Sequence, residues 1–386
     1  MGDSFTDVTY NSLGGRLVKS VGGALVGLLL AVLSFPVLWW NEGRINLADV
    51  AKKAVSLTAD GSGGGECELV SVTGAVSTTE QLGDPTYLKP GNYLLLERNA
   101  EMWSWKETSH SREEKQLGGS SKTVTTYDYD ETWSPHPQDS SGFRHADGHE
   151  NPPMRIESQT FHASSAKLGA FTFDPGDAEL PSAQKLQPSP GDYLVGNVQR
   201  GGTRNSEVGP IVAGEYLFDG SGSLAHPRVG DERISFLAVK PLSNATLFGK
   251  RSGSTITAAM VGDGDRFFRV LNGTRDEAIQ TLQTEHNMTT WLLRLAGFLM
   301  MWLGAAAVFG PINTFLDIVP IVGGAGRFLV TLVLFPITLG ISVVVIVVSA
   351  IAHSLILSAL VALGMIAGAI VYFKKRRPAG ATVAAA

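Results

Sequence analysis

An apolar block near the end of the chain, residues 291–373, constrains the fold more than any other feature. It contains few residues that are acidic, basic or histidine: Arg294, Asp317, Arg327 and His353. A helix needs about 20 apolar residues to cross a bilayer core of about 30 Å. The block therefore predicts transmembrane helices at 291–309, 328–350 and 355–373. Buried helices of soluble proteins rarely run this long without a polar face.

A second apolar run, residues 21–40, predicts a first transmembrane helix after a polar tail of residues 1–20. It ends in two tryptophans, which favour the membrane–water interface. Because no small-residue cleavage site follows, we interpret it as a permanent anchor. Two G-x-x-x-G pairs lie in the outer spans and allow close helix packing, either within one subunit or between subunits: Gly23 with Gly27, and Gly364 with Gly368.

The charges that flank the spans predict their orientation. A run of four basic residues, 374–377, directly follows the last span, and the positive-inside rule places the tail 374–386 in the cytoplasm. Four spans then put the tail 1–20 on the same side and residues 41–290 outside the cytoplasm. The segment 310–327 is apolar but broken by proline and glycine. We expect it to form an interfacial or re-entrant loop on the cytoplasmic side.

The region between the first two spans has the period of β-strands. Its alternating segments are separated by glycine, proline and aspartate clusters, which are typical of turns. We predict strands at 68–76, 93–98, 101–107, 123–133, 155–162, 193–197, 214–218, 233–240, 245–250 and 267–271. A capping box at Thr274 predicts a helix over 274–287. The expected fold is a multi-pass helical membrane protein of four spans, with a large β-rich α+β extracytoplasmic domain between spans one and two.

Composition and motifs give little support for catalysis. The net charge of -5 gives no case for nucleic acid binding, and the single cysteine, Cys67, excludes an internal disulfide framework. The sequence lacks a nucleophile elbow and the H-E-x-x-H pattern. We therefore predict no catalytic residues and no cofactor.

The loop 135–152 holds His136, His145 and His149 beside carboxylates. Because their spacing matches no known zinc pattern, His145 and His149 are weak metal candidates, and a solvated loop is favoured.

Several short motifs follow one another along the chain, among them Asn41-Glu42-Gly43-Arg44, Gly148-His149 followed by Asn151-Pro152, and Val229-Gly230-Asp231 followed by Arg233. In this order they resemble the transmembrane protein 43 family, also called LUMA. Each motif is weak alone, and their order makes the resemblance specific. The residues that match the family's motifs and that we predict to have structural roles are Asn41, Glu42, Gly43, Arg44, Trp105, His149, Asn151, Asp231, Arg233, Trp291, Arg294 and Asp317.

The resemblance implies four spans, a lumenal domain, and residence in the endoplasmic reticulum and inner nuclear membrane. It also implies self-association and the organisation of membrane protein complexes, with emerin and lamins among the partners. The tail AGATVAAA departs from the family, and the composition favours a bacterial member. In a bacterium the domain would be periplasmic and the nuclear partners would not apply.

The resulting hypothesis is a non-catalytic membrane scaffold. Its expected partners are the lipid bilayer, further copies of itself and other membrane proteins, without nucleic acid. Two alternatives remain open at this point. One is an extracytoplasmic ligand- or metal-binding sensor or enzyme that uses the region of His149. The other is a channel formed by an oligomer.

Overall fold

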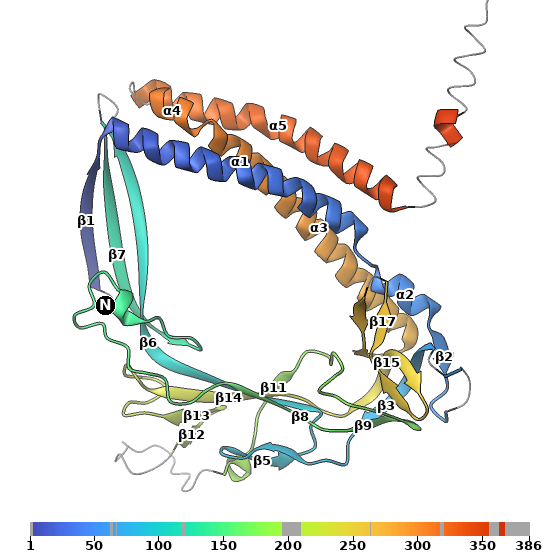
Figure 1. Cartoon of the computed structure of the whole chain (residues 1–386). Coiled ribbons are helices and arrows are strands. Elements are labelled where there is room, and N and C mark those ends of the chain that lie inside the picture. Colours follow the sequence, from blue (N-terminus) through green and yellow to red (C-terminus); the bar gives the residue numbers. More distant parts are fainter. Residues whose placement is uncertain are drawn as a thin grey trace, which may run out of the picture. The chain divides into compact units, whose positions relative to one another are not determined.

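The computed structural model describes residues 3–61, 65–66, 68–116, 120–194, 210–262, 264–316, 320–354 and 363–366. The chain divides into two compact units. The first, here called the β-rich unit, comprises Met1–Thr9, Asn46–Glu113 and Thr123–His286. The second, the helical unit, comprises Tyr10–Ile45, Glu114–Lys122 and Asn287–Ala386. Figure 1 gives the order of the elements along the chain.

The helices are α1 (Leu13–Gly43), α2 (Leu47–Lys53), α3 (Arg275–Val308), α4 (Gly310–Leu316) and α5 (Pro320–His353). Among the described residues, three stretches are long and apolar enough to cross a membrane: Leu13–Lys53, Arg275–Val308 and Phe328–His353. They contain the first three predicted spans. The fourth predicted span, 355–373, lies outside the described residues except for a helical turn at 363–366.

Three predicted boundaries differ from the structure. Helix α1 begins at Leu13, eight residues before the predicted span, because the Ser12 side chain accepts a hydrogen bond from the Gly15 amide and caps the helix there. Helix α3 joins the predicted helix 274–287 to the span that follows it. The predicted loop 310–327 contains α4 and the start of α5, because its prolines lie in the first turns of these helices, where they are tolerated.

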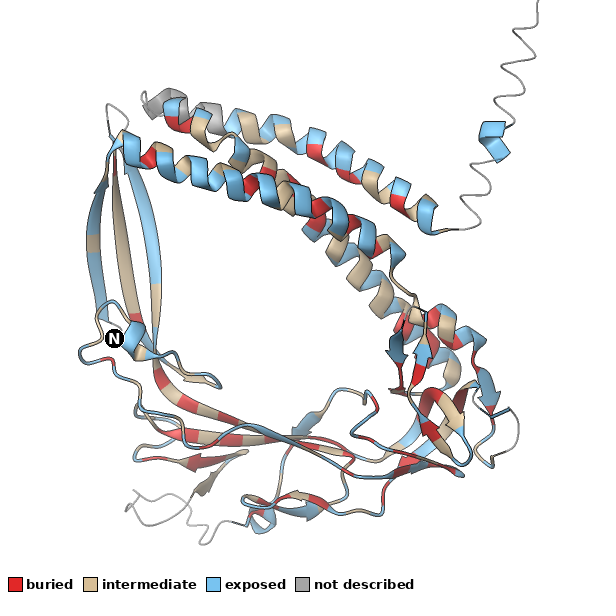
Figure 2. Ribbon diagram, viewed as in Figure 1, coloured by how far each residue is buried: buried red, intermediate tan, exposed pale blue. Residues whose placement is uncertain are grey.

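The helical unit exposes much of its apolar surface. Helix α1 has exposed leucines and valines along its length, and α5 exposes Phe328, Val344 and Val348 among others. In Figure 2 both helices are mostly exposed, whereas buried positions concentrate in the strands. An all-round apolar helix that is not covered by protein is typical of a membrane span. The chain is therefore an integral membrane protein with a β-rich region between its first two membrane helices.

The first large sheet has eight strands, with β1-β7-β6-β14-β13-β12 as its main order and β8 and β11 paired to β6 and β14. Its strands are β1 (Asp3–Asn11), β6 (Leu95–Lys115), β7 (Ser121–Ser134), β8 (Gln159–His162), β11 (Gln184–Leu186), β12 (Ile211–Ala213), β13 (Tyr216–Asp219) and β14 (Glu232–Val239). Strand β14 buries Ile234, Phe236 and Ala238 on one face, as its alternation predicted.

The second large sheet has seven strands in the order β19-β15-β16-β10-β9-β3-β2. They are β2 (Val55–Leu57), β3 (Leu69–Ser77), β9 (Ala166–Leu168), β10 (Phe171–Phe173), β15 (Leu242–Ser252), β16 (Thr255–Thr257) and β19 (Arg269–Asn272). Two small sheets pair β4 (Leu82–Asp84) with β5 (Leu88–Gly91), and β17 (Ala259–Val261) with β18 (Asp265–Phe267). Short 3-10 turns lie at Ser140–Gly142 and Pro190–Asp192.

Most predicted strands are present, with three differences. The predicted strands 93–98 and 101–107 are one long strand, β6, which continues to Lys115. Only the last four residues of 155–162 form a strand. At 193–197, Tyr193 makes an isolated bridge to Leu88, Leu194 is not in a strand, and residues 195–197 lie outside the described residues. Residues 3–11, which we expected in a polar tail, form β1 at the edge of the first sheet.

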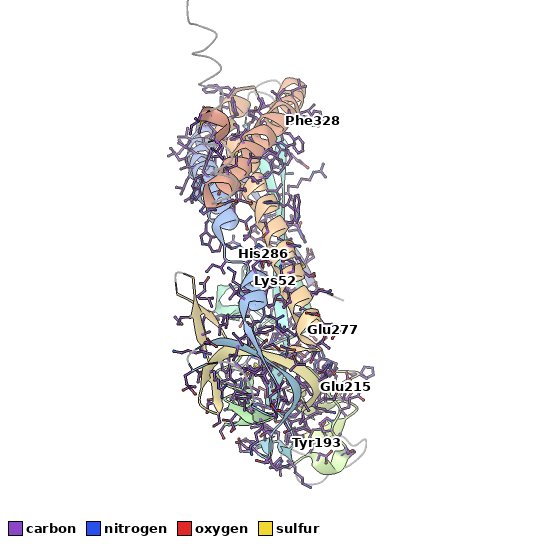
Figure 3. All side chains as sticks on the ribbon, turned by 90° about the vertical axis from the view of Figure 1, so that its right-hand side faces the viewer. Lys52, Tyr193, Glu215, Glu277, His286 and Phe328 are labelled. Atoms are coloured by element: carbon purple, nitrogen blue, oxygen red, sulfur yellow. The ribbon has the colours of Figure 1, made fainter. Side chains whose placement is uncertain are left out.

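The β-rich unit has three hydrophobic clusters, one of which includes helices. Alanines of α2 pack with Ala278, Ile279 and Leu282 of α3, and with Phe248 and Phe267 from the strands. Figure 3 labels Lys52 on α2, and Glu277 and His286 on α3. Burial of the larger of these side chains, Ile, Leu and Phe, contributes about 1.5–3 kcal/mol each. The first turns of α3 are thus part of the β-rich unit's core.

Candidate functional site

An ion pair joins the end of α1 to α3 within the helical unit. Arg294 Nε and a terminal nitrogen of the same guanidinium each lie 2.8 Å from one carboxylate oxygen of Glu42. The side chain of Glu42 is 6% exposed and that of Arg294 is 25% exposed. Paired bonds of this kind fix both distance and orientation. Trp291, which is largely exposed, lies 4.9 Å from the Arg294 guanidinium.

Thr290, one residue before Trp291, receives two further contacts from α1. The Asn41 side-chain amide donates to the Thr290 carbonyl at 3.1 Å, and Arg44 donates to the Thr290 hydroxyl at 3.2 Å. Asn41 is buried. The Arg44 guanidinium also lies 5.9 Å from the ring of Trp40. The polar residues that follow the first apolar run therefore hold α1 against α3.

Gly43 belongs to the same turn but faces α5. A Cβ atom at this position would lie 2.6 Å from His353 Nε2. The His353 ring is 5.3 Å from that of Trp39, and Ser349 donates to the Trp39 carbonyl at 2.9 Å. Glycine leaves room for the imidazole, which a side chain at this position would displace. We call the contacts of residues 41–44 with Thr290, Arg294 and His353 the helix-end network.

The glycine pairs have different surroundings. Gly27 meets α3, where a Cβ atom would lie 2.6 Å from Ala307 Cβ and 2.7 Å from the Gly304 carbonyl oxygen. Gly23 and Gly364 have open space around them. Gly368 and Asp317 lie outside the described residues. Gly27 thus has a packing partner within the chain, whereas a role of Gly23 between subunits stays a prediction.

A second group of predicted residues meets beside the long strand β6. The Asn151 side chain accepts from the Trp105 amide at 2.8 Å and donates to the Trp105 carbonyl at 2.9 Å. The Asn151 side chain thereby binds both the N–H and the C=O of Trp105, the two groups that a neighbouring strand would otherwise pair with. Gln138 similarly accepts from the Glu107 amide. The loop 135–152 thus covers part of an edge that would otherwise be open to strand addition.

His149 is buried in an aromatic cluster and is 3% exposed. Its ring stacks on Tyr129 at 4.1 Å and meets Trp105 edge-on at 4.7 Å. Its Nδ1 lies 3.0 Å from the His145 carbonyl and donates to it. Burial, and secondly the hydrogen bond to Glu107, raise the pKa of Tyr129 above its usual value. The phenol therefore keeps its proton and can donate to Glu107.

Asp231 and Arg233 lie at the start of β14 and have separate partners. The buried Asp231 carboxylate accepts from the amides of Ser221, Gly222 and Arg228 at 2.7–3.1 Å and so fixes the preceding turn. Arg233 pairs with Glu101 at 2.7 Å. Its guanidinium also lies over the rings of Trp133 and Tyr216, at 4.4 and 4.6 Å. Both residues hold the sheet and its turns together.

Metal binding by the histidine loop can be tested directly. His145 and His149 are near each other, but among the described residues no group of three or more His, Cys, Asp or Glu could hold a metal ion. We expect metal analysis of the purified protein to give no stoichiometric zinc. One equivalent of zinc per chain that disappears with His145→Ala and His149→Ala would contradict this expectation. His226→Ala, which changes a histidine outside this loop, is the control.

Sequence reasoning missed several members of these groups. Among them are Ser349 in the helical unit, and Phe5, Glu107 and Arg144 in the β-rich unit. His353 was noted only as an ionisable residue of the apolar block. These residues contact partners that are far away in the sequence.

Known proteins are similar to most of this chain. The family model for Transmembrane protein 43 matches residues 102–355. Transmembrane protein 43 of Homo sapiens is 28% identical over 325 residues, which cover 79% of this chain and 78% of that protein. The Rattus norvegicus protein is 27% identical with the same coverage. A homolog from Drosophila melanogaster is 25% identical over 299 residues, 73% of this chain and 75% of that protein. No solved structure matches the chain.

Proposed function

This chain belongs to the transmembrane protein 43 family, and from that premise we propose that it is a non-catalytic membrane scaffold that self-associates. In this role it anchors other membrane proteins and displays the β-rich unit outside the cytoplasm. Its partners are the lipid bilayer, further copies of itself and other membrane proteins. It acts in a bacterial inner membrane with a periplasmic unit, or in the endoplasmic reticulum and inner nuclear membrane of a eukaryote.

One observation carries this proposal: the residues that match the family's motifs use their polar groups to hold the chain together. Asn41, Glu42 and Arg44 bind α3, Asn151 covers the edge of β6, and Asp231 fixes a turn. A scaffold needs rigid membrane helices and a rigid displayed unit. These contacts supply that rigidity without using a reactive group.

The topology follows in part from the sequence and in part from the fold. Four membrane segments and the basic run 374–377 support a cytoplasmic C-terminus and an extracytoplasmic β-rich unit. Strand β1, however, pairs with β7 in the sheet of that unit. This pairing favours the side of the β-rich unit for Asp3–Thr9, whereas the sequence predicts a cytoplasmic N-terminus, and the tags described below decide between the two.

Protease protection tests this topology, and mass measurement tests self-association. Tags at the N-terminus and in the exposed turn at Gly253 are expected to be cleaved from the same face, and a C-terminal tag from the opposite, cytoplasmic face. Cleavage of the N-terminal tag together with the C-terminal one would contradict the placement of β1.

The mass of the protein in detergent, measured by light scattering, should be a multiple of 41.0 kDa. A single 41.0 kDa species at all concentrations in both detergent and nanodiscs would refute self-association.

A further inference from the structure

Strand β1 is held by a group of side chains that surround Phe5. The ring of Phe5 stacks on His145 at 4.4 Å and meets Tyr129 at 5.9 Å and His149 at 6.2 Å edge-on. Trp105 lies behind His149. We call the five side chains that receive β1 the β1 socket: Trp105, Tyr129, Arg144, His145 and His149. All of them, and residues 3–9, belong to the β-rich unit.

Two aspartates flank Phe5 and meet the basic groups of the socket. Asp7 pairs with Arg144 Nε at 2.7 Å and lies 4.0 Å from His145 Nε2. Asp3 lies 3.6 Å from His149 Nε2. Because His149 Nδ1 donates to the His145 carbonyl, Nε2 is the ring nitrogen left for Asp3. The socket thus recognises an aromatic ring between two carboxylates at alternate positions of an extended strand.

Strand β1 as a whole is little buried, and Phe5 itself is 38% exposed. Seven of its nine residues are exposed, and the strand forms an edge of its sheet. Ser12 alone separates it from α1, and from Tyr10 onward the chain belongs to the helical unit. An edge strand with few buried residues, joined through a short connection, is an element that identical subunits can exchange at low cost. The socket would bind Asp3, Phe5 and Asp7 in the same way whether β1 came from its own chain or from a second copy.

We propose that the β1 socket is a binding site for extended segments of the form Asp-x-Phe-x-Asp, and that in the assembled protein it takes β1 from a second copy of this chain. The second half rests on the proposed self-association. Exchange of β1 needs no contacts between subunits other than those that β1 already makes within one chain. The recognition is by aromatic stacking and charge-assisted pairs, with strand pairing to β7.

A peptide experiment tests the recognition. A chain without residues 2–11, purified in detergent, should bind a labelled peptide of residues 3–11 saturably in fluorescence anisotropy. Phe5→Ala in the peptide should weaken binding roughly tenfold or more, because it removes the aromatic anchor. Arg144→Ala in the chain should also weaken it, whereas Arg266→Ala, at a similarly exposed arginine paired with Asp177, should not. Equal affinity for the native and Phe5→Ala peptides would overturn the proposal.

A cross-linking experiment on the full chain tests the exchange and does not need the truncated form. In a Cys67→Ser background, Thr6→Cys and Asp147→Cys are placed on two differently tagged, co-expressed chains and treated with a bismaleimide. Both positions are exposed and leave Phe5 and the side chains of the β1 socket in place. Exchange predicts a cross-linked dimer that carries both tags. Cross-links only when both cysteines share one chain would overturn the exchange. Light scattering on the same samples reports self-association separately, so an assembly without inter-chain cross-links would refute only the exchange.

Discussion

Replacing Arg294 by alanine is expected to destabilise the helical unit by about 3–5 kcal/mol, the cost typical of leaving one partner of a buried ion pair alone. Glu42 is 6% exposed, so its carboxylate would stay largely buried without a counter-charge. The loss should appear as a lower midpoint of thermal unfolding in detergent, together with a smaller yield of inserted protein. Arg294→Lys should give an intermediate result, because lysine keeps the charge but cannot form the paired bonds.

The double variant Glu42→Met with Arg294→Met separates charge burial from simple loss of packing. Replacing both partners of a buried pair by apolar side chains is often close to neutral. The double variant should therefore unfold at a higher temperature than Arg294→Ala. Arg266→Ala breaks an exposed pair with Asp177 and should cost at most about 1 kcal/mol. If Arg294→Ala and the double variant unfold at the same temperature, the ion pair does not hold α1 and α3 together.

The membrane helices were predictable from sequence because their signal is local. About 20 consecutive apolar residues identify a span without knowledge of the fold. The same holds for β14, where Ile234, Phe236 and Ala238 alternate with more exposed residues over a single strand. Boundaries were less predictable. Met288, Thr289 and Thr290 are not typical of a span, yet they continue α3, because the helix passes from the β-rich core into the apolar block without a break.

The contacts within the candidate sites were not predictable, because each depends on residues far apart in the sequence. Glu42 and Arg294 are separated by 252 positions. Motif resemblance identified both residues but did not pair them. Strand β1 was missed for a related reason. Its Thr, Val and Tyr residues favour strands, but a short polar edge strand has no periodic apolar face. Its place in the sheet comes from Phe5, Asp3 and Asp7, whose partners lie about 140 residues later.

Changing Gly27 to isoleucine is expected to prevent correct packing of α1 on α3. A Cβ atom there would lie 2.6 Å from Ala307 Cβ and 2.7 Å from the Gly304 carbonyl oxygen, which is backbone and cannot move aside alone. Overpacking of a tight contact typically costs about 1–3 kcal/mol, and a branched side chain against backbone should reach at least the upper end. We expect a lower unfolding midpoint in detergent and a reduced yield of inserted protein.

Gly23→Ile is the matched control on the same helix, since Gly23 has nothing within 4 Å of a Cβ atom. This variant should insert and unfold like the wild type. Its mass in detergent then decides the role of the first G-x-x-x-G pair. A folded monomer would assign Gly23 to an interface between subunits, because lipid-facing helices associate through close packing of small residues. Wild-type mass for Gly23→Ile would limit the pair to packing within one chain. Wild-type stability for Gly27→Ile would contradict the α1–α3 contact itself.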